Sequence, residues 1–174
     1  MIQKYTYGNP FETEAIVVSV PAADGTPAYG TISTEKGFSF TYDMDDNDVV
    51  YGLGEANRGI NKRGYIYESN CSDQPDHSED KISLYGAHNF IVVSGKQTFG
   101  LFVDYPGKLR FDIGYTLSAQ LKITCEDADL YLYVIEGETP YDIVKQFRKI
   151  IGRSYIPPKF AFGFGQSRWG YTTA

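Results

Sequence analysis

The sequence predicts an all-β fold, a β-sandwich followed by one helix. Over the first 136 residues, short apolar or aromatic runs alternate with turn signals, which is the spacing of a sandwich and not of alternating strands and helices. Aromatic residues make up 16% of the chain, and 18 glycines accompany them. Aromatic side chains favour pleated, half-buried strands and glycine supplies turns, so composition and pattern agree.

The predicted strands are apolar or aromatic runs bounded by turn residues. In chain order they are Ala15–Val20, Gly37–Tyr42, Val49–Leu53, Tyr65–Tyr67, Phe90–Ser94, Phe99–Asp104, Leu109–Ile113, Leu121–Thr124 and Leu130–Ile135. One stretch interrupts this rhythm, because residues 68–81 contain almost nothing apolar. Loops of this length without secondary structure are uncommon inside compact domains and are often functional, so we expect a functional loop here.

A helix is predicted to begin after Thr139. Thr139 is suited to cap the first free N–H groups, and Pro140 fits the first helical position, where no donor is needed. Gly152 is a natural helix stop. Apolar residues recur at steps of three and four, which predicts one buried stripe made of Ile143, Val144, Phe147, Ile150 and Ile151.

After this helix the sequence changes character. Pro157-Pro158 precedes an aromatic run, Phe160 to Phe164, which is typical of a buried strand, and Trp169 follows as the only tryptophan. No later element is available to cover that strand, so we expect the chain to break off as a second domain begins. The predicted division is a sandwich over 1–136, a linker helix and connector over 137–158, and the first strand of another domain over 159–174. Uncovered apolar surface on the tail predicts self-association, for example into a homo-oligomer, or disorder beyond about residue 158.

Charge and cysteine content exclude several classes of function. The net charge is −6 and no Lys/Arg cluster exceeds a pair, so a phosphate backbone would be repelled and nucleic acid is excluded as a partner. No segment approaches 18 apolar residues, so no membrane span is predicted. Cys71 and Cys125 lie far apart and form no CxxC pair, which favours neither a disulfide scaffold nor a zinc site. These features predict a soluble, cytoplasmic protein.

Neither a metal nor a cofactor is predicted. The acidic run 43–48 lacks the Gly and Glu that an EF-hand loop needs at its sixth and twelfth positions, so we interpret it as a solvated acidic turn. Gly52-Leu53-Gly54 follows a strand but precedes no helical pattern, which excludes a dinucleotide fingerprint. His88 begins a strand and is interpreted as a structural residue.

Asp73 and Trp169 are the candidate binding residues. A sugar site needs a carboxylate that accepts hydrogen bonds from paired hydroxyls, and an aromatic face that covers the C–H side of the ring. Asp73 lies in the long polar stretch and Trp169 follows the terminal apolar run. Spacing alone does not select these two residues.

Several blocks of sequence occur in an order that resembles a known family. They are Val50-Tyr51-Gly52-Leu53-Gly54-Glu55, Asp73-Gln74-Pro75, Leu84–Phe90, Glu138–Phe147, Ile151-Gly152-Arg153 and Pro157–Tyr171. Together they resemble glycoside hydrolase family 31, the α-glucosidase and α-xylosidase group, over about residues 29 to 173.

The resemblance implies a galactose-mutarotase-like β-sandwich with a C-terminal linker helix, packed against a (β/α)₈ barrel of which 159–174 would be the truncated first strand. It implies a retaining hydrolase of α-linked oligosaccharides in which two barrel aspartates act as nucleophile and acid/base. Those aspartates would follow residue 174, so this chain by itself is expected to be inactive. Asp73 would contact sugar hydroxyls, and Trp169 would lie at the mouth of the barrel. The loop lacks the aromatic residue that often follows its proline in this family.

Two alternatives stay open. The first is a free-standing carbohydrate-binding module, which would share the sandwich and carry out no chemistry. The second is a mutarotase-like epimerase in which His88 and Glu55 act as acid and base.

Overall fold

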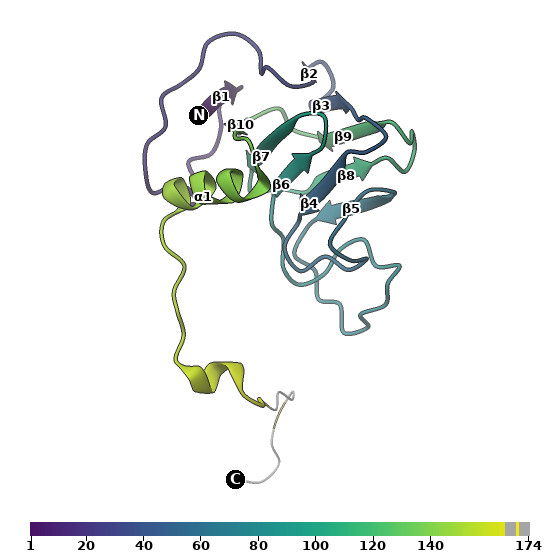
Figure 1. Cartoon of the computed structure of the whole chain (residues 1–174), viewed down its shortest axis with the longest axis vertical. Helices are drawn as coiled ribbons and strands as arrows, with labels where there is room; N and C mark the ends of the chain where they lie inside the picture. Colours follow the sequence, from purple (N-terminus) through teal and green to yellow (C-terminus); the bar gives the residue numbers. More distant parts are fainter. Residues whose placement is uncertain (166–169, 171–174) are drawn as a thin grey trace.

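The computed structural model describes residues 1–165 and residue 170. In this part of the chain, two five-stranded sheets pack face to face, so the predicted all-β sandwich is confirmed (Figure 1). Sheet A has the order β1-β10-β7-β6-β4, and sheet B has the order β2-β3-β9-β8-β5. Neighbouring strands in both sheets pair antiparallel.

The strands predicted between Gly37 and Ile135 are confirmed to within two residues at each end. Sheet A contains β1 (Ile2–Tyr7), β4 (Val49–Gly52), β6 (Phe90–Ser94), β7 (Thr98–Asp104) and β10 (Leu130–Glu136). Sheet B contains β2 (Thr31–Ser33), β3 (Phe38–Asp43), β5 (Tyr65–Ser69), β8 (Leu109–Ile113) and β9 (Gln120–Cys125).

Strand β10 is buried on both of its faces. Leu130, Leu132 and Val134 face the core between the sheets, and the side chains that alternate with them face outward. The outward Tyr131 and Tyr133 pack with the helix that covers sheet A. This two-sided burial explains why the strand is an almost unbroken apolar run instead of an alternating one.

Helix α1 (Pro140–Ile151) lies across the outer face of sheet A (Figure 1). The Thr139 hydroxyl accepts from the Asp142 N–H, and the Asp142 carboxylate accepts from the Thr139 N–H, which completes a capping box. Gly152 ends the helix at φ 86°, a conformation that favours glycine. The predicted helix is therefore confirmed at both ends.

Close contact between helix α1 and β7 depends on Gly100. A Cβ atom at Gly100 would lie 2.4 Å from Cγ2 of Ile143, which is too close for any side chain. Ile143 and Ile150 are buried, and Phe147 stacks on Phe90 of β6 with ring centroids 3.9 Å apart. The predicted apolar stripe is correct except at Val144, which is exposed.

The strand predicted at Ala15–Val20 is wrong, because this segment is irregular. The N–H groups of Val17 and Val18 donate to the carbonyl of Ile150, at 2.8 and 3.2 Å, and so close the last turn of helix α1. Ile16 and Val20 pack with the outward tyrosines of β10. The edge next to β10 is already taken by β1, so the apolar run covers a surface instead of joining a sheet.

Two strands were not among those predicted. Strand β1 alternates polar and apolar residues weakly, and its conformation comes from pairing with β10, from Ile2 opposite Ile135 to Tyr7 opposite Leu130. Strand β2 has three residues and pairs only with β3 at the edge of sheet B. Neither strand could be predicted from its local sequence pattern, because pairing with a distant strand determines its conformation.

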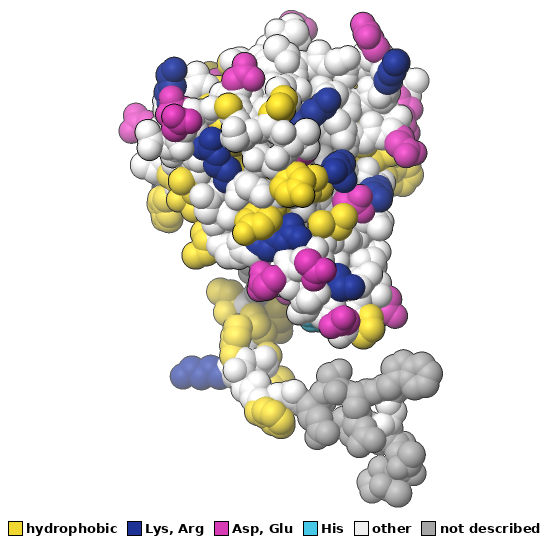
Figure 2. Space-filling model, turned by 90° about the vertical axis from the view of Figure 1, so that its right-hand side faces the viewer, with side chains coloured by type: hydrophobic (Ala, Val, Ile, Leu, Met, Phe, Trp, Pro, Cys, Tyr) yellow, Lys and Arg dark blue, Asp and Glu magenta, His cyan; other side chains and the backbone are white. Residues whose placement is uncertain are grey.

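The strand predicted at Phe160–Phe164 is also wrong. Residues Lys159–Phe162 form a 3₁₀ helix, η1, in which the N–H groups of Ala161 and Gly163 donate to Pro158 and Phe160. Phe160, Phe162 and Phe164 are 83%, 75% and 98% exposed, and the segment extends away from the sandwich (Figures 1 and 2). No described strand lies beside it, so its backbone groups find partners locally.

The acidic run is not simply a solvated turn, because Asp48 is only 2% exposed. Its carboxylate accepts from the Tyr42 hydroxyl, the Asp45 N–H and the Lys96 N–H, each at 3.0 Å. Asp48 therefore joins the turn after β3 to the turn between β6 and β7. Burial and the hydrogen bond to Asp48 raise the pKa of the Tyr42 hydroxyl.

We expect Ile143→Ala to lower the free energy of unfolding by about 2–5 kcal/mol, because it opens a cavity under helix α1. The matched control is Val144→Ala on the exposed face of the same helix, which should change it by no more than about 0.5 kcal/mol. Urea denaturation followed by circular dichroism measures both. Equal losses would show that the helix is not docked through Ile143.

We expect Asp48→Ala to cost about 1–3 kcal/mol, because it leaves the buried Tyr42 hydroxyl and two N–H groups without their acceptor. Asp46→Ala is the control, since Asp46 is exposed in the same turn. Thermal unfolding at neutral pH compares the two variants. A solvated turn, as the sequence predicts, would give the same melting temperature for both.

Candidate functional site

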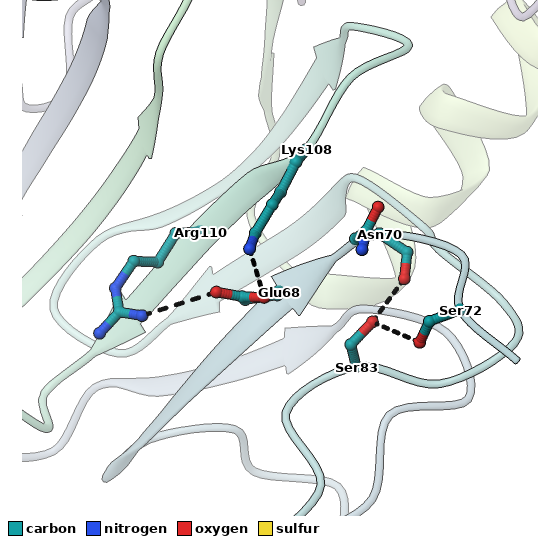
Figure 3. Close-up of polar contacts among 6 residues, drawn as sticks. All are labelled: Glu68, Asn70, Ser72, Ser83, Lys108 and Arg110. Carbon is teal, nitrogen blue, oxygen red and sulfur yellow. Dashed lines mark hydrogen bonds and ion pairs between the residues drawn. The ribbon is translucent and has the colours of Figure 1, made fainter. Parts of the chain in front are cut away.

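The polar loop, residues 70–89, connects β5 to β6 without a helix or strand. Its base is closed by backbone hydrogen bonds from the Glu68 N–H to Ile82 O (2.7 Å) and from the Ser72 N–H to Leu84 O (3.0 Å). The hydroxyls of Ser72 and Ser83 lie 3.1 Å apart, and Ser83 also donates to the Asn70 carbonyl (Figure 3). The two arms of the loop therefore lie side by side as an extension of β5.

Charged side chains fix the start of this loop to the neighbouring strand. Glu68 points toward Lys108 and Arg110, at 2.7 and 3.8 Å (Figure 3). Lys108 and Arg110 are about half exposed, so these pairs contribute little stability, about 0–1 kcal/mol each. The backbone pairing of Ser69 with Leu109 sets the register of β5 on β8 at the point where the polar loop begins.

Asp73 is exposed at the start of the tip, residues 73–81, directly after the closed base. Hydrogen bonding to the Asp73 carboxylate raises the pKa of the Tyr85 hydroxyl. The ring of Tyr85 meets the ring of His77 edge-to-face, with centroids 5.4 Å apart. Asp73, His77 and Tyr85, hereafter the loop cluster, thus present a carboxylate, an imidazole and a phenol together at the surface.

Tyr85 is the aromatic residue that sequence reasoning did not select. It is 49% exposed, so part of its ring is available beside Asp73. The signal that could have identified it is an aromatic residue at the far end of a long polar loop. Trp169, the predicted aromatic partner of Asp73, lies outside the described residues, so that pairing stays a prediction.

Glu55 and His88, the pair of the epimerase alternative, both lie close to Gly86. A Cβ atom at Gly86 would be 3.3 Å from Oε2 of Glu55 and 3.7 Å from Cε1 of His88. Gly54, with φ 58°, allows the His88 ring to approach closely, because a Cβ atom there would lie 2.6 Å from Nδ1. His88 is exposed, and its interpretation as a structural residue stays a prediction.

Beside His88 a groove of about 580 Å³ separates the polar loop from helix α1. Its apolar part is formed by Phe90, Phe102 and Phe147, which pack against one another. Its polar part includes the buried Asp104, whose carboxylate accepts from the Thr13 hydroxyl at 2.6 Å. Burial raises the pKa of Asp104, so this carboxyl is easier to protonate than an exposed one.

Among the described residues, no group of three His, Cys, Asp or Glu side chains is placed to hold a metal ion. Over the same residues, no helix is both long and apolar enough to cross a membrane.

Comparison with known proteins places this architecture in a family. The profile described as "Glycosyl hydrolase 31 N-terminal galactose mutarotase-like domain" matches residues 5–112. Alpha-glucosidase 2 of Bacillus thermoamyloliquefaciens is 33% identical over 149 residues, which are 80% of this chain and 19% of that protein. An alpha-xylosidase of Lactiplantibacillus pentosus is 27% identical, covering 69% of this chain and 15% of that protein.

Solved structures show the same fold. A GH31 dextranase of Flavobacterium johnsoniae, complexed with isomaltotriose, superposes with a TM-score of 0.69 and 25% identity, over 76% of this chain and 16% of that one. A cycloalternan-degrading enzyme of Trueperella pyogenes gives a TM-score of 0.60 at 20% identity, over 74% and 20% of the two chains. This chain spans about a fifth or less of the length of these proteins. The resemblance seen in the sequence is confirmed, and the chain belongs to the family of glycosyl hydrolase 31 N-terminal galactose mutarotase-like domains.

Proposed function

We propose that this chain is the N-terminal sandwich of a retaining glycoside hydrolase that acts on α-linked glucosides. In this proposal the sandwich supports a catalytic (β/α)₈ barrel and lends the polar loop to the substrate pocket. The catalytic acids belong to the barrel, so the chain by itself is inactive. Family membership supports the proposal, as do the names of the relatives, which include alpha-glucosidases and an alpha-xylosidase.

The observation that carries the proposal is the exposed Asp73 carboxylate beside the Tyr85 ring on a loop with a closed base. An ionised carboxylate accepts hydrogen bonds from two neighbouring sugar hydroxyls, and an aromatic ring covers the apolar face of a sugar. A loop whose arms are hydrogen-bonded presents these groups with little ordering cost on binding. Trp169 is the second substrate contact in this proposal.

The surface around helix α1 suits contact with a barrel. The aromatic groove beside His88 and the exposed phenylalanines of residues 159–164 together offer a large apolar surface. Apolar patches of this kind commonly mark surfaces that another domain covers. We therefore assign 1–136 to the sandwich, 137–158 to the linker and 159–174 to the start of the barrel.

The proposed substrate is an α-linked oligosaccharide, and the proposed location is the cytoplasm. The Flavobacterium dextranase binds isomaltotriose in its solved complex, which supports an oligosaccharide of α-linked glucose.

The cytoplasmic location is supported by the cysteines. Cys71 and Cys125 are both free thiols, as is usual in a reducing compartment.

We expect Asp73→Asn, made in the complete protein encoded by the gene that contains this sequence, to lower kcat/KM about 10- to 100-fold. The amide of asparagine is uncharged, so the variant loses charge-assisted hydrogen bonds to the sugar that contribute about 1.5–3 kcal/mol. Asp76→Asn, three residues along the same exposed tip, is the matched control and should change kcat/KM less than twofold. Hydrolysis of p-nitrophenyl α-glucoside and of isomaltotriose measures both variants.

Equal activity of Asp73→Asn and Asp76→Asn would reject the substrate contact. Calorimetric binding of isomaltotriose by residues 1–174 alone would instead favour the free-standing carbohydrate-binding module. Aldose mutarotation by this chain, followed by polarimetry and lost in His88→Ala, would favour the epimerase.

We expect residues 1–174, produced alone, to self-associate at micromolar concentration through the exposed tail. Replacing Phe160, Phe162 and Phe164 by serine removes the three exposed phenylalanines of the tail and should give a monomer in sedimentation velocity. Tyr115→Ser, which alters an exposed aromatic residue on the β8–β9 turn, is the control and should leave association unchanged. A monomeric unaltered chain would contradict the expectation.

A further inference from the structure

Arg58 connects the tip of the polar loop to the turn that follows β4. Its backbone N–H donates to a carboxylate oxygen of Glu79 at 2.9 Å, and its Nε donates to the Glu79 carbonyl at 2.6 Å. Its Nη2 donates to the Asp80 carbonyl at 2.7 Å. Three donors of a single residue therefore hold two consecutive residues of the tip.

The same guanidinium is anchored to sheet B. Nη1 donates to the carbonyl of Ile66 at 3.1 Å, and the group lies over the ring of Tyr65, 4.8 Å from its centroid. The planar guanidinium offers donors in several fixed directions and stacks on an aromatic face, whereas the ammonium of lysine is a single point charge. Arg58 thus links the tip to a strand through contacts that lysine cannot reproduce.

The turn that carries Arg58 is itself held from inside. The ammonium of the buried Lys62 donates to the carbonyls of Ala56, Asn57 and Gly59, at 2.6, 3.1 and 2.7 Å. The side chain of Asn57 donates to the Ser78 carbonyl at 2.9 Å, next to the residues that Arg58 holds. Lys62 therefore holds the turn around Arg58 through contacts that do not involve the tip.

A continuous path of contacts leads from Arg58 to Asp73. Arg58 and Asn57 hold residues 78–80, and His77 precedes them and packs edge-to-face on Tyr85. The Asp73 carboxylate raises the pKa of the Tyr85 hydroxyl, so these two side chains lie near each other. The base of the loop closes the path from the other side, through Ser72 and Leu84. We propose that Arg58 is a positioning residue, which holds the tip of the polar loop so that Asp73 stays oriented toward the sugar.

This inference rests on the proposed function for its catalytic consequence, whereas its structural consequence is independent of it. Arg63 offers a matched control because it uses the same chemistry elsewhere. Its Nη1 donates to the carbonyls of Asp45, Asp46 and Asp48, and its Nη2 donates to Ser118. None of these partners belongs to the polar loop.

The first test is amide hydrogen exchange of the complete protein, with Arg58→Gln, Arg58→Lys and Arg63→Gln compared. Both Arg58 variants should accelerate exchange in residues 70–86 at least tenfold, whereas Arg63→Gln should leave that segment unchanged and accelerate exchange near residues 45–48. Unchanged exchange in the polar loop of the Arg58 variants would overturn the inference, whatever the enzyme activity shows.

The second test is a double-mutant cycle on kcat/KM. Arg58→Gln should lower kcat/KM about 10- to 100-fold, mainly through KM, because a displacement of about 1 Å is enough for such a loss. In an Asp73→Asn background the same change should cost less than twofold, since Arg58 acts through Asp73. A loss of full size in that background, or an equal loss in Arg63→Gln, would overturn the inference. If Asp73→Asn itself has no effect on kcat/KM, the proposed function is rejected. The exchange experiment then decides the role of Arg58.

Discussion

Burial of sheet A on both faces is the constraint on which the rest of this structure depends. Strand β10 pairs with β1 and β7, faces the sandwich core with its leucines and faces helix α1 with its tyrosines. Burying about 100 Å² of apolar surface contributes roughly 2.5 kcal/mol. A strand buried on both faces gains this stabilisation twice, and so it links sheet B, sheet A and helix α1. The segment 15–20, helix α1 and the aromatic groove all take their places from the outer face of this sheet.

A rigid sandwich gives its loops fixed starting points. The polar loop leaves β5, which is paired with β8, and it enters β6, which lies against helix α1. Between these points the loop contains few apolar residues, so hydrogen bonds hold it instead of a core. Binding residues are often carried in this way, on loops that a stable scaffold positions.

Sequence patterns predicted the parts of the fold that local chemistry determines. Strands such as β8, with buried Leu109, Phe111 and Ile113 and exposed Arg110, follow from alternation, and helix α1 follows from Thr139, Pro140 and Gly152. The segments 15–20 and 160–164 were predicted wrongly, because an apolar run becomes a strand only where a sheet edge is free to receive it. In the candidate site, Asp73 came from a family resemblance, while the neighbourhood of Tyr85 and the contacts of Arg58 join residues distant in sequence and leave no local pattern.

The guanidinium of Arg58 recognises carbonyl oxygens of Ile66, Glu79 and Asp80 and none of their side chains. Backbone oxygens persist through almost any substitution, so the contacts of the guanidinium with residues 79 and 80 do not depend on the side chains at those positions. Natural drift, or a mutant library directed at residues 74–76, can therefore alter the side chains offered to a ligand while Arg58 still holds the tip. A tip that Arg58 anchors through the backbone, and whose side chains can vary, is suited to the divergence of substrate specificity.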